Sequence, residues 1–319
     1  MAIASGKKIE VVSYGEPLIG IYPPKDCSIG DDQPLSKTWG GDTSNFALAL
    51  SRLGHGVAYL TRISTDDLGQ SFLRLWQRGG VDISLVQRDE HRSLGLYFVS
   101  FEAEKHNFIY YRKNSAASCI DAGKINWELV KQARVLHLSG ISQAISQNAL
   151  EVSFQLMEYA KKNGLLVSYD INFRSLLWKR ELALAVILHT IGEYVDILEM
   201  TDEELTLLGG EEKLDGFLDH FPRVPELVAL KMGEGGGLLR RGGEVKRFKA
   251  FAVEVADTVG AGDAFDAGLI AGILENMELE ELGVFANAVA ASTCRGIGPL
   301  RRQPTRDEVL ELIRQHSRD

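Results

Sequence analysis

Short apolar runs alternate with amphipathic helical segments over most of this chain, and this alternation is the feature that most restricts its fold. Six runs have the composition and length of buried strands, at 9–14, 57–63, 135–138, 165–171, 197–200 and 227–232. Helical patterns lie between several of them, at 43–53, 68–78, 148–162 and 181–192. The alternation predicts an α/β domain with a mostly parallel sheet covered by helices on both faces.

Two segments break the alternation because they look like strands without a helix between them. They cover residues 17–39 and 93–114, and the second has apolar side chains at alternate positions, Leu94, Leu96 and Phe98. Two such pieces could pair into a small sheet beside the main domain. The pattern fits either a lid over an active site or an ordinary extension of the main sheet. We therefore expect a single domain over residues 1–319, with a hairpin at 238–248 that turns at Gly242-Gly243.

Charge and composition exclude several classes of function. A net charge of -9 lacks the basic footprint that non-specific nucleic-acid binding requires, although local arginines can still bind an anionic substrate. The longest wholly apolar run, 182–188, is too short to span a membrane. Three cysteines far apart in the sequence are typical of reduced thiols. We expect a cytoplasmic protein that binds neither nucleic acid nor membrane.

One segment near the C-terminus has the composition of a phosphate site. Residues 257–268 read Asp-Thr-Val-Gly-Ala-Gly-Asp-Ala-Phe-Asp-Ala-Gly and lead into a helix expected over 257–277. Backbone N–H groups and the positive end of a helix dipole bind anions at such a position. Asp263 would stand beside the anion, where a carboxylate can take a proton from an attacking hydroxyl. The alternative is a helix start in which Asp263 is only a favourable first-turn acid.

The stretch from Asp257 to Phe265 resembles the second signature of the ribokinase (PfkB) family of carbohydrate kinases. An early segment, Gly40-Gly41-Asp42-Thr43-Ser44-Asn45, resembles the first signature. Together they imply a ribokinase-like three-layer fold with a small β-sheet lid, and a kinase that uses ATP and Mg²⁺ on a small sugar or sugar acid. A P-loop motif is absent from the sequence, and Gly260 and Gly262 are followed by Phe265 rather than a glycine, unlike a dinucleotide fingerprint.

The same resemblance implies roles for individual residues. Asp263 would be the catalytic base, and the amides of Gly260, Ala261 and Gly262 would form an anion hole. Glu204 would organise Mg²⁺ through water, although Thr201 replaces the asparagine that usually precedes it by three positions; the two residues are also spaced as a helix capping box. A monovalent cation such as K⁺ would bind at Asp257 and Val259. The remaining implied contacts are Gly40, Gly41 and Asn45 to the sugar, and Asn172, Thr201, Lys231, Gly233, Gly235 and Asn287 to ATP.

The substrate is indicated by three further segments. Tyr110-Tyr111-Arg112, the 170–178 stretch and Gly15-Glu16-Pro17 resemble 2-keto-3-deoxygluconate kinases, which implies that Tyr97, Tyr111 and Arg112 face a sugar acid. Arg174 would lie between the sugar and the nucleotide phosphates. Fructokinases share part of this pattern, so fructose or another sugar stays open, as do arginines that merely face solvent and a non-catalytic sugar or nucleotide sensor. Family members often dimerise through their lids, so a homodimer is also implied.

Overall fold

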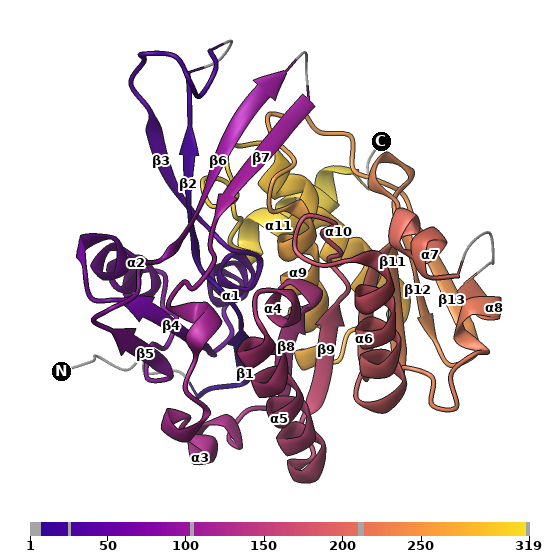
Figure 1. The fold of residues 1–319 in the computed structure, drawn as a ribbon. Coiled ribbons are helices and arrows are strands. Elements are labelled where there is room, and N and C mark those ends of the chain that lie inside the picture. The colour runs from indigo at the N-terminus through magenta and orange to yellow at the C-terminus, as the bar shows by residue number, and fades with distance from the viewer. Residues whose placement is uncertain (1–7, 25–26, 103–104, 210–213, 317–319) are drawn as a thin grey trace.

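The computed structural model describes residues 8–24, 27–102, 105–209 and 214–316, and a nine-stranded sheet runs through its centre (Figure 1). The strand order is β13-β12-β11-β10-β9-β8-β1-β4-β5, and every neighbouring pair is parallel except β11–β12 and β12–β13. The strands are β1 (Val11–Tyr14), β4 (Val57–Ser64), β5 (Val86–Asp89), β8 (Val135–Ser139), β9 (Leu166–Asp170), β10 (Ile197–Thr201), β11 (Leu227–Lys231), β12 (Gly237–Arg241) and β13 (Glu244–Phe248).

Helices cover both faces of this sheet, so its apolar strands are buried on both sides and the fold has three layers (Figure 1). One face packs against α1 (Asp42–Arg52), α2 (Asp67–Arg78), α9 (Ala261–Leu274), α10 (Leu279–Cys294) and α11 (Arg306–His316). The other packs against α3 (Trp127–Val130), α5 (Gln147–Asn163), α6 (Arg180–Glu193), α7 (Asp202–Gly209) and α8 (Leu214–Leu218), with the short α4 (Gly140–Ala144) after β8. The three-layer α/β fold expected from the sequence is confirmed.

A second, separate sheet of four strands stands above the main body (Figure 1). Its order is β3-β2-β6-β7, with β2 (Leu18–Tyr22) and β3 (Ser36–Gly40) from the first irregular segment and β6 (Gly95–Glu102) and β7 (Lys105–Tyr111) from the second. Two segments distant in sequence therefore pair as expected, β2 with β6 in parallel. Residues 25–26 and 103–104 of these segments lie outside the described residues.

Most element boundaries match their patterns within two residues, and one does not. The expected helix over 257–277 starts only at Ala261, because Gly260 has a positive φ of 83° and the preceding loop is held by the Asp257 carboxylate. That carboxylate accepts hydrogen bonds from the backbone N–H groups of Val259 and Gly298. The 238–248 hairpin is confirmed, with Gly242 at φ 57° in its turn. In the described ranges, the helices are all too short or too polar to cross a bilayer.

Candidate active site

Polar side chains gather where three neighbouring parallel strands end. Asp170, Thr201 and Lys231 are the last residues of β9, β10 and β11, and the N-terminus of α9 lies beside them. The carboxyl ends of parallel strands meet at one edge of a sheet, which is where open α/β folds bind their ligands. This edge is the candidate active site.

The first turn of α9 supplies backbone donors to this edge. Gly260 is the N-cap residue, and a β-carbon there would lie 2.5 Å from Cβ of Pro299, so the left-handed φ and the close approach both require glycine. The first N–H groups of a helix lack partners within the helix. With the helix dipole they form a site for an anion, although the N–H of Ala261 already donates to the carbonyl oxygen of Thr258 over 3.1 Å. Asp263 stands in the same turn.

Asp263 makes a specific contact rather than a helix cap. Its Oδ2 accepts a hydrogen bond of 2.8 Å from Nδ2 of Asn45 on α1. Although the side chain keeps some accessible surface, removal from solvent raises the pKa of Asp263 to about 7. The charges of Asp42 and Asp170 act in the same direction, whereas the Asn45 hydrogen bond and Lys231 oppose it. A carboxyl group with such a pKa is suited to general base chemistry near neutral pH.

Asn45 is set in place by the start of α1. Gly41 caps this helix at a φ of 103°, where a β-carbon would lie 2.3 Å from the backbone oxygen of Glu16. Asn45 itself is 4% exposed, and among the described residues its Oδ1 has no hydrogen-bond partner. A buried acceptor without a partner is costly, so this oxygen is suited to receive a hydrogen bond from a bound hydroxyl group.

Asp42 adds a second carboxylate next to Asn45. Ser139 at the end of β8 donates to its Oδ2, and Nδ2 of Asn172 lies 3.5 Å from the same oxygen. Asn172 has a φ of 38°, a left-handed conformation that asparagine tolerates better than most residues. Burial raises the pKa of Asp42, and the Ser139 hydrogen bond and the Arg112 charge oppose the rise.

Lys231 lies between two aspartates. Its Nζ is 3.1 Å from Oδ1 of Asp170 and 3.0 Å from Oδ1 of Asp266, which is buried on α9. A β-carbon placed on Gly262 would be 3.8 Å from the same Nζ, so the ammonium group lies beside the first turn of α9. Burial alone would disfavour the charged lysine, but Asp170, Asp266 and Glu204 outweigh it and raise the pKa of Lys231.

Glu204 closes this side of the site from α7. Its Oε2 accepts from the backbone N–H of Thr201, while Oγ1 of Thr201 accepts from the N–H of Glu204, which confirms the capping box. Its Oε1 accepts from the N–H of Phe173, which ties the loop after β9 to α7. Burial first, and Asp170 second, raise the pKa of Glu204.

Arg112, expected to face a sugar acid, is already paired. Its side chain is 8% exposed, and its Nε donates to Oε2 of Glu16 over 2.7 Å, with Nη2 beside the same oxygen. Ser115 donates to the other oxygen of Glu16. Glu16 is 1% exposed, so one buried carboxylate joins the end of β1 to the residues that follow β7.

Tyrosines lie on both faces of the small sheet. Side chains alternate along a strand, so Tyr97 on β6 and Tyr110 on β7, which pair directly, share the face that continues to Arg112. The hydroxyl of Tyr97 lies 3.1 Å from that of Tyr22 and equally close to a β-carbon built on Gly40. Tyr111 lies on the opposite face, 65% exposed and against Phe98. Tyr110 therefore occupies the inner position for which we selected Tyr111.

The remaining candidates lie around the rim. Arg174 is exposed and, among the residues that the structure describes, donates only to the adjacent Phe173 carbonyl, so its guanidinium is accessible to a ligand. Gly233 and Gly235 form a short exposed 3₁₀ turn after β11. Asn287 on α10 donates to the carbonyl oxygen of Lys249 over 2.7 Å. The site thus brings together Asn45, Asp263 and Lys231 closely, with Arg174 and Asn287 at its margins.

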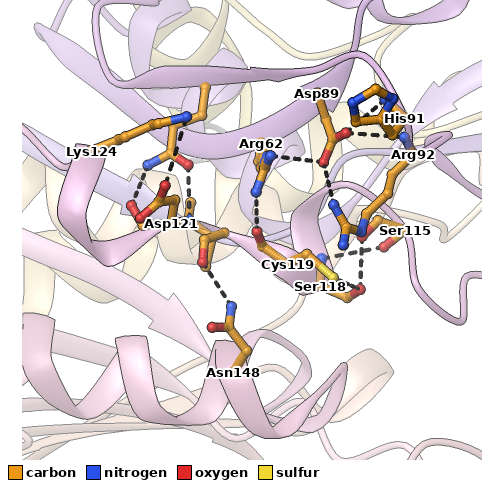
Figure 2. A network of polar contacts seen from close by, with 12 residues as sticks. Arg62, Asp89, His91, Arg92, Ser115, Ser118, Cys119, Asp121, Lys124 and Asn148 are labelled. Carbon is orange, nitrogen blue, oxygen red and sulfur yellow. Dashed lines mark hydrogen bonds and ion pairs between the residues drawn. The ribbon is translucent and has the colours of Figure 1, made fainter.

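A polar network fixes the base of the small sheet (Figure 2). Asp89 accepts from the backbone N–H groups of His91 and Arg92, and its Oδ2 pairs with both Arg62 and Arg92. Arg62 also donates to the carbonyl oxygen of Cys119, while the N–H of Ala116 donates to the carbonyl of Ser93. The chain before β6 is thereby joined to the chain after β7.

Comparisons with known proteins identify the family of this chain. Residues 8–306 match the family described as pfkB family carbohydrate kinase. The chain is 33% identical to fructokinase-1 of Zea mays (98% of this chain, 99% of the relative) and 29% identical to 2-dehydro-3-deoxygluconokinase of Bacillus subtilis (96% of each). A putative ribokinase II from E. coli, solved in complex with ATP and Mg²⁺, has a TM-score of 0.87 and 25% identity over 97% of this chain and all of that one. This chain belongs to the pfkB family of carbohydrate kinases.

Proposed function

We propose that this protein transfers the γ-phosphate of ATP to a hydroxyl group of a small sugar, with Asp263 as the base. One observation carries the proposal: the Asp263 carboxylate stands in the first turn of α9 and is hydrogen-bonded to Asn45, whose Oδ1 is a buried acceptor without a partner in the described part of the chain. The amides of Gly260, Ala261 and Gly262 can stabilise charge on the transferring phosphoryl group. Asp263 can accept the hydroxyl proton, while Asn45 and the Gly40-Gly41 backbone orient the sugar.

The nucleotide would lie along the exposed turn after β11. We assign Gly233, Gly235 and Asn287 to its ribose and adenine side, and Asn172, Arg174, Thr201 and Lys231 to its phosphates. The E. coli protein was solved in complex with ATP and Mg²⁺, which supports ATP as the nucleotide.

Magnesium fits the donors of this site only through water. No three His, Cys, Asp or Glu side chains within the described ranges are grouped to hold a metal ion directly. Mg²⁺ usually keeps several waters and binds few protein ligands in phosphate sites. Glu204 fits this use, because each of its oxygens accepts one backbone N–H and retains a second lone pair. Bound Mg²⁺ would neutralise charge on the phosphates.

The small sheet is part of the same proposal as a lid of one kinase domain. Tyr97 of this sheet lies against Gly40, and Tyr110 pairs with Tyr97 on the same face. Arg112, which follows β7, acts electrostatically on Asp42 in the main site. A lid that covers the sugar would keep water from accepting the phosphoryl group.

For the substrate we propose 2-keto-3-deoxygluconate, with fructose as the second candidate. The inner tyrosines with Arg112, and the accessible guanidinium of Arg174, favour a sugar that carries a carboxylate. The pairing of Arg112 with Glu16 favours a neutral sugar instead, because the arginine charge is already matched. The named relatives include both a fructokinase and a 2-dehydro-3-deoxygluconokinase.

A coupled ADP-release assay tests these assignments. The purified chain with ATP and Mg²⁺ is offered 2-keto-3-deoxygluconate, fructose, ribose and adenosine in turn. We expect kcat/KM for the keto acid to exceed that for fructose at least tenfold. Faster turnover of fructose would overturn the proposed substrate but would still support the proposed kinase activity. Binding of ATP without ADP release from any sugar would favour a sensor and overturn the proposed reaction.

Three smaller assignments complete the proposal. A cytoplasmic location, where ATP is available, is supported by three cysteines that are free among the described residues. A monovalent cation at Asp257 and Val259 predicts higher kcat in KCl than in choline chloride. A homodimer through the outer face of the lid is supported by exposed Ile109 and Tyr111, and Tyr111→Glu should then lower the mass seen by light scattering.

A further inference from the structure

The placement of Lys231 goes beyond what a phosphate-binding lysine requires. An ammonium group has three donors, and in the described part of the chain two of them reach Asp170 and Asp266. Both carboxylates are buried, at 5% and 1% exposure, and the lysine side chain is 13% exposed. The third N–H remains for a ligand, and Nζ lies 3.8 Å from a β-carbon built on Gly262, beside the first turn of α9.

We propose that Asp266 and Asp170 are positioning residues that hold the Lys231 ammonium as a fixed cation at the anion hole, where it contacts the transferring phosphoryl group. The proposal rests on the kinase function given above. Asp266 follows Asp263 by one helical turn, so the same stretch of α9 carries the base and the group that aims the cation.

The two carboxylates offset two properties that make a lysine poorly suited to serve as a fixed cation. Its four-carbon stem is flexible, and a buried lysine readily loses its proton. Two carboxylates on separate elements, the end of β9 and the first turns of α9, fix the position of Nζ and keep it charged. A charge placed before the reaction needs no reorganisation when negative charge develops in the transition state.

A purely structural ion-pair cluster is the competing explanation. Removing one partner from a buried pair destabilises a protein whatever its function, so loss of stability cannot separate the two explanations. A fall in kcat without a change in the sugar KM can separate them. Weaker binding of ATP without weaker binding of AMP, which lacks the terminal phosphate, can also separate them.

The first experiment compares Asp266→Asn with Asp266→Ala. Asparagine keeps an oxygen that can accept from Lys231, whereas alanine removes it. We expect kcat to fall about 10- to 100-fold in the alanine variant, the size of effect produced by a small misplacement of a catalytic group. Most of the loss should be recovered in the asparagine variant, with the sugar KM unchanged in both. Wild-type kcat in Asp266→Ala would overturn the proposal.

The second experiment needs no turnover. Lys231→Met should weaken ATP binding, measured by calorimetry, by about 10- to 150-fold and leave AMP binding unchanged. Equal weakening of ATP and AMP would overturn the phosphate contact. Asp215→Ala, which removes an aspartate paired with Arg240 at the surface, is the matched control and should change neither nucleotide. A wild type that releases no ADP with any sugar would refute the proposed kinase function, while the ATP–AMP contrast would still test the lysine contact.

Discussion

Replacing Glu16 with alanine tests how much the buried ion pair at the base of the small sheet contributes to the stability of the protein. Glu16 is the partner of Arg112 and of Ser115, and both charged side chains are at most 8% exposed. The alanine variant would leave the Arg112 charge buried without its partner, which costs about 3–5 kcal/mol. With an unfolding entropy of about 2.1 cal/mol/K per residue and 319 residues, this corresponds to a Tm lower by about 4–7 °C.

Thermal unfolding followed by circular dichroism measures this difference. Glu280→Ala is the matched control, because Glu280 is 74% exposed and its pairing with Lys246 contributes little. The double change Glu16→Gln with Arg112→Gln removes both charges and should recover part of the lost Tm. A Tm of Glu16→Ala within 1 °C of the wild type would refute the reasoning.

Two other predictions concern catalysis and motion. Log kcat/KM should fall with unit slope below about pH 7, because Asp263 must be deprotonated to accept a proton and its pKa is raised to about 7; a profile that is flat from pH 5.5 to 8 would contradict this. Hydrogen exchange in β3 and in residues 95–99 should slow when saturating sugar is added, while the β12–β13 hairpin serves as the control. Equal exchange with and without sugar would contradict the proposal that the small sheet is a lid.

The sequence was sufficient for the architecture because the determining signals are local. Apolar runs of strand length between amphipathic helices predict a covered parallel sheet, and both signature segments mark helix starts. The sequence also indicated that the two helix-free segments could pair with each other, and they do so through β2 and β6. The helix start at 257 was wrong because the Asp257 carboxylate bonds to Gly298, a contact between residues 41 positions apart.

The contacts within the site were less accessible to sequence reasoning. Strand ends alone could have brought Asp170 and Lys231 together, since each is the last residue of a parallel strand. Nothing local shows that Arg112 pairs with Glu16, 96 positions earlier. Which of Tyr110 and Tyr111 faces inward depends on the register of β7 against β6, and a shift of one residue reverses the answer. Asp266 was missed because its partner is a side chain from β11.

The most direct test of the central claim is one sample of Asp263→Asn, measured for kcat and for Tm at pH 8. The raised pKa means that folding favours the protonated carboxyl: this stability is fully present below the unfolded pKa of about 4 and is lost as pH rises through about 7. Asparagine removes the cost of the buried charge, so the variant should be at least as stable as the wild type at pH 8. Its kcat should nevertheless fall by at least ~10², the low end for loss of a general base. Near-normal kcat with a Tm lowered by the loss of about 1 kcal/mol, as expected of a helix-capping residue, would contradict the account.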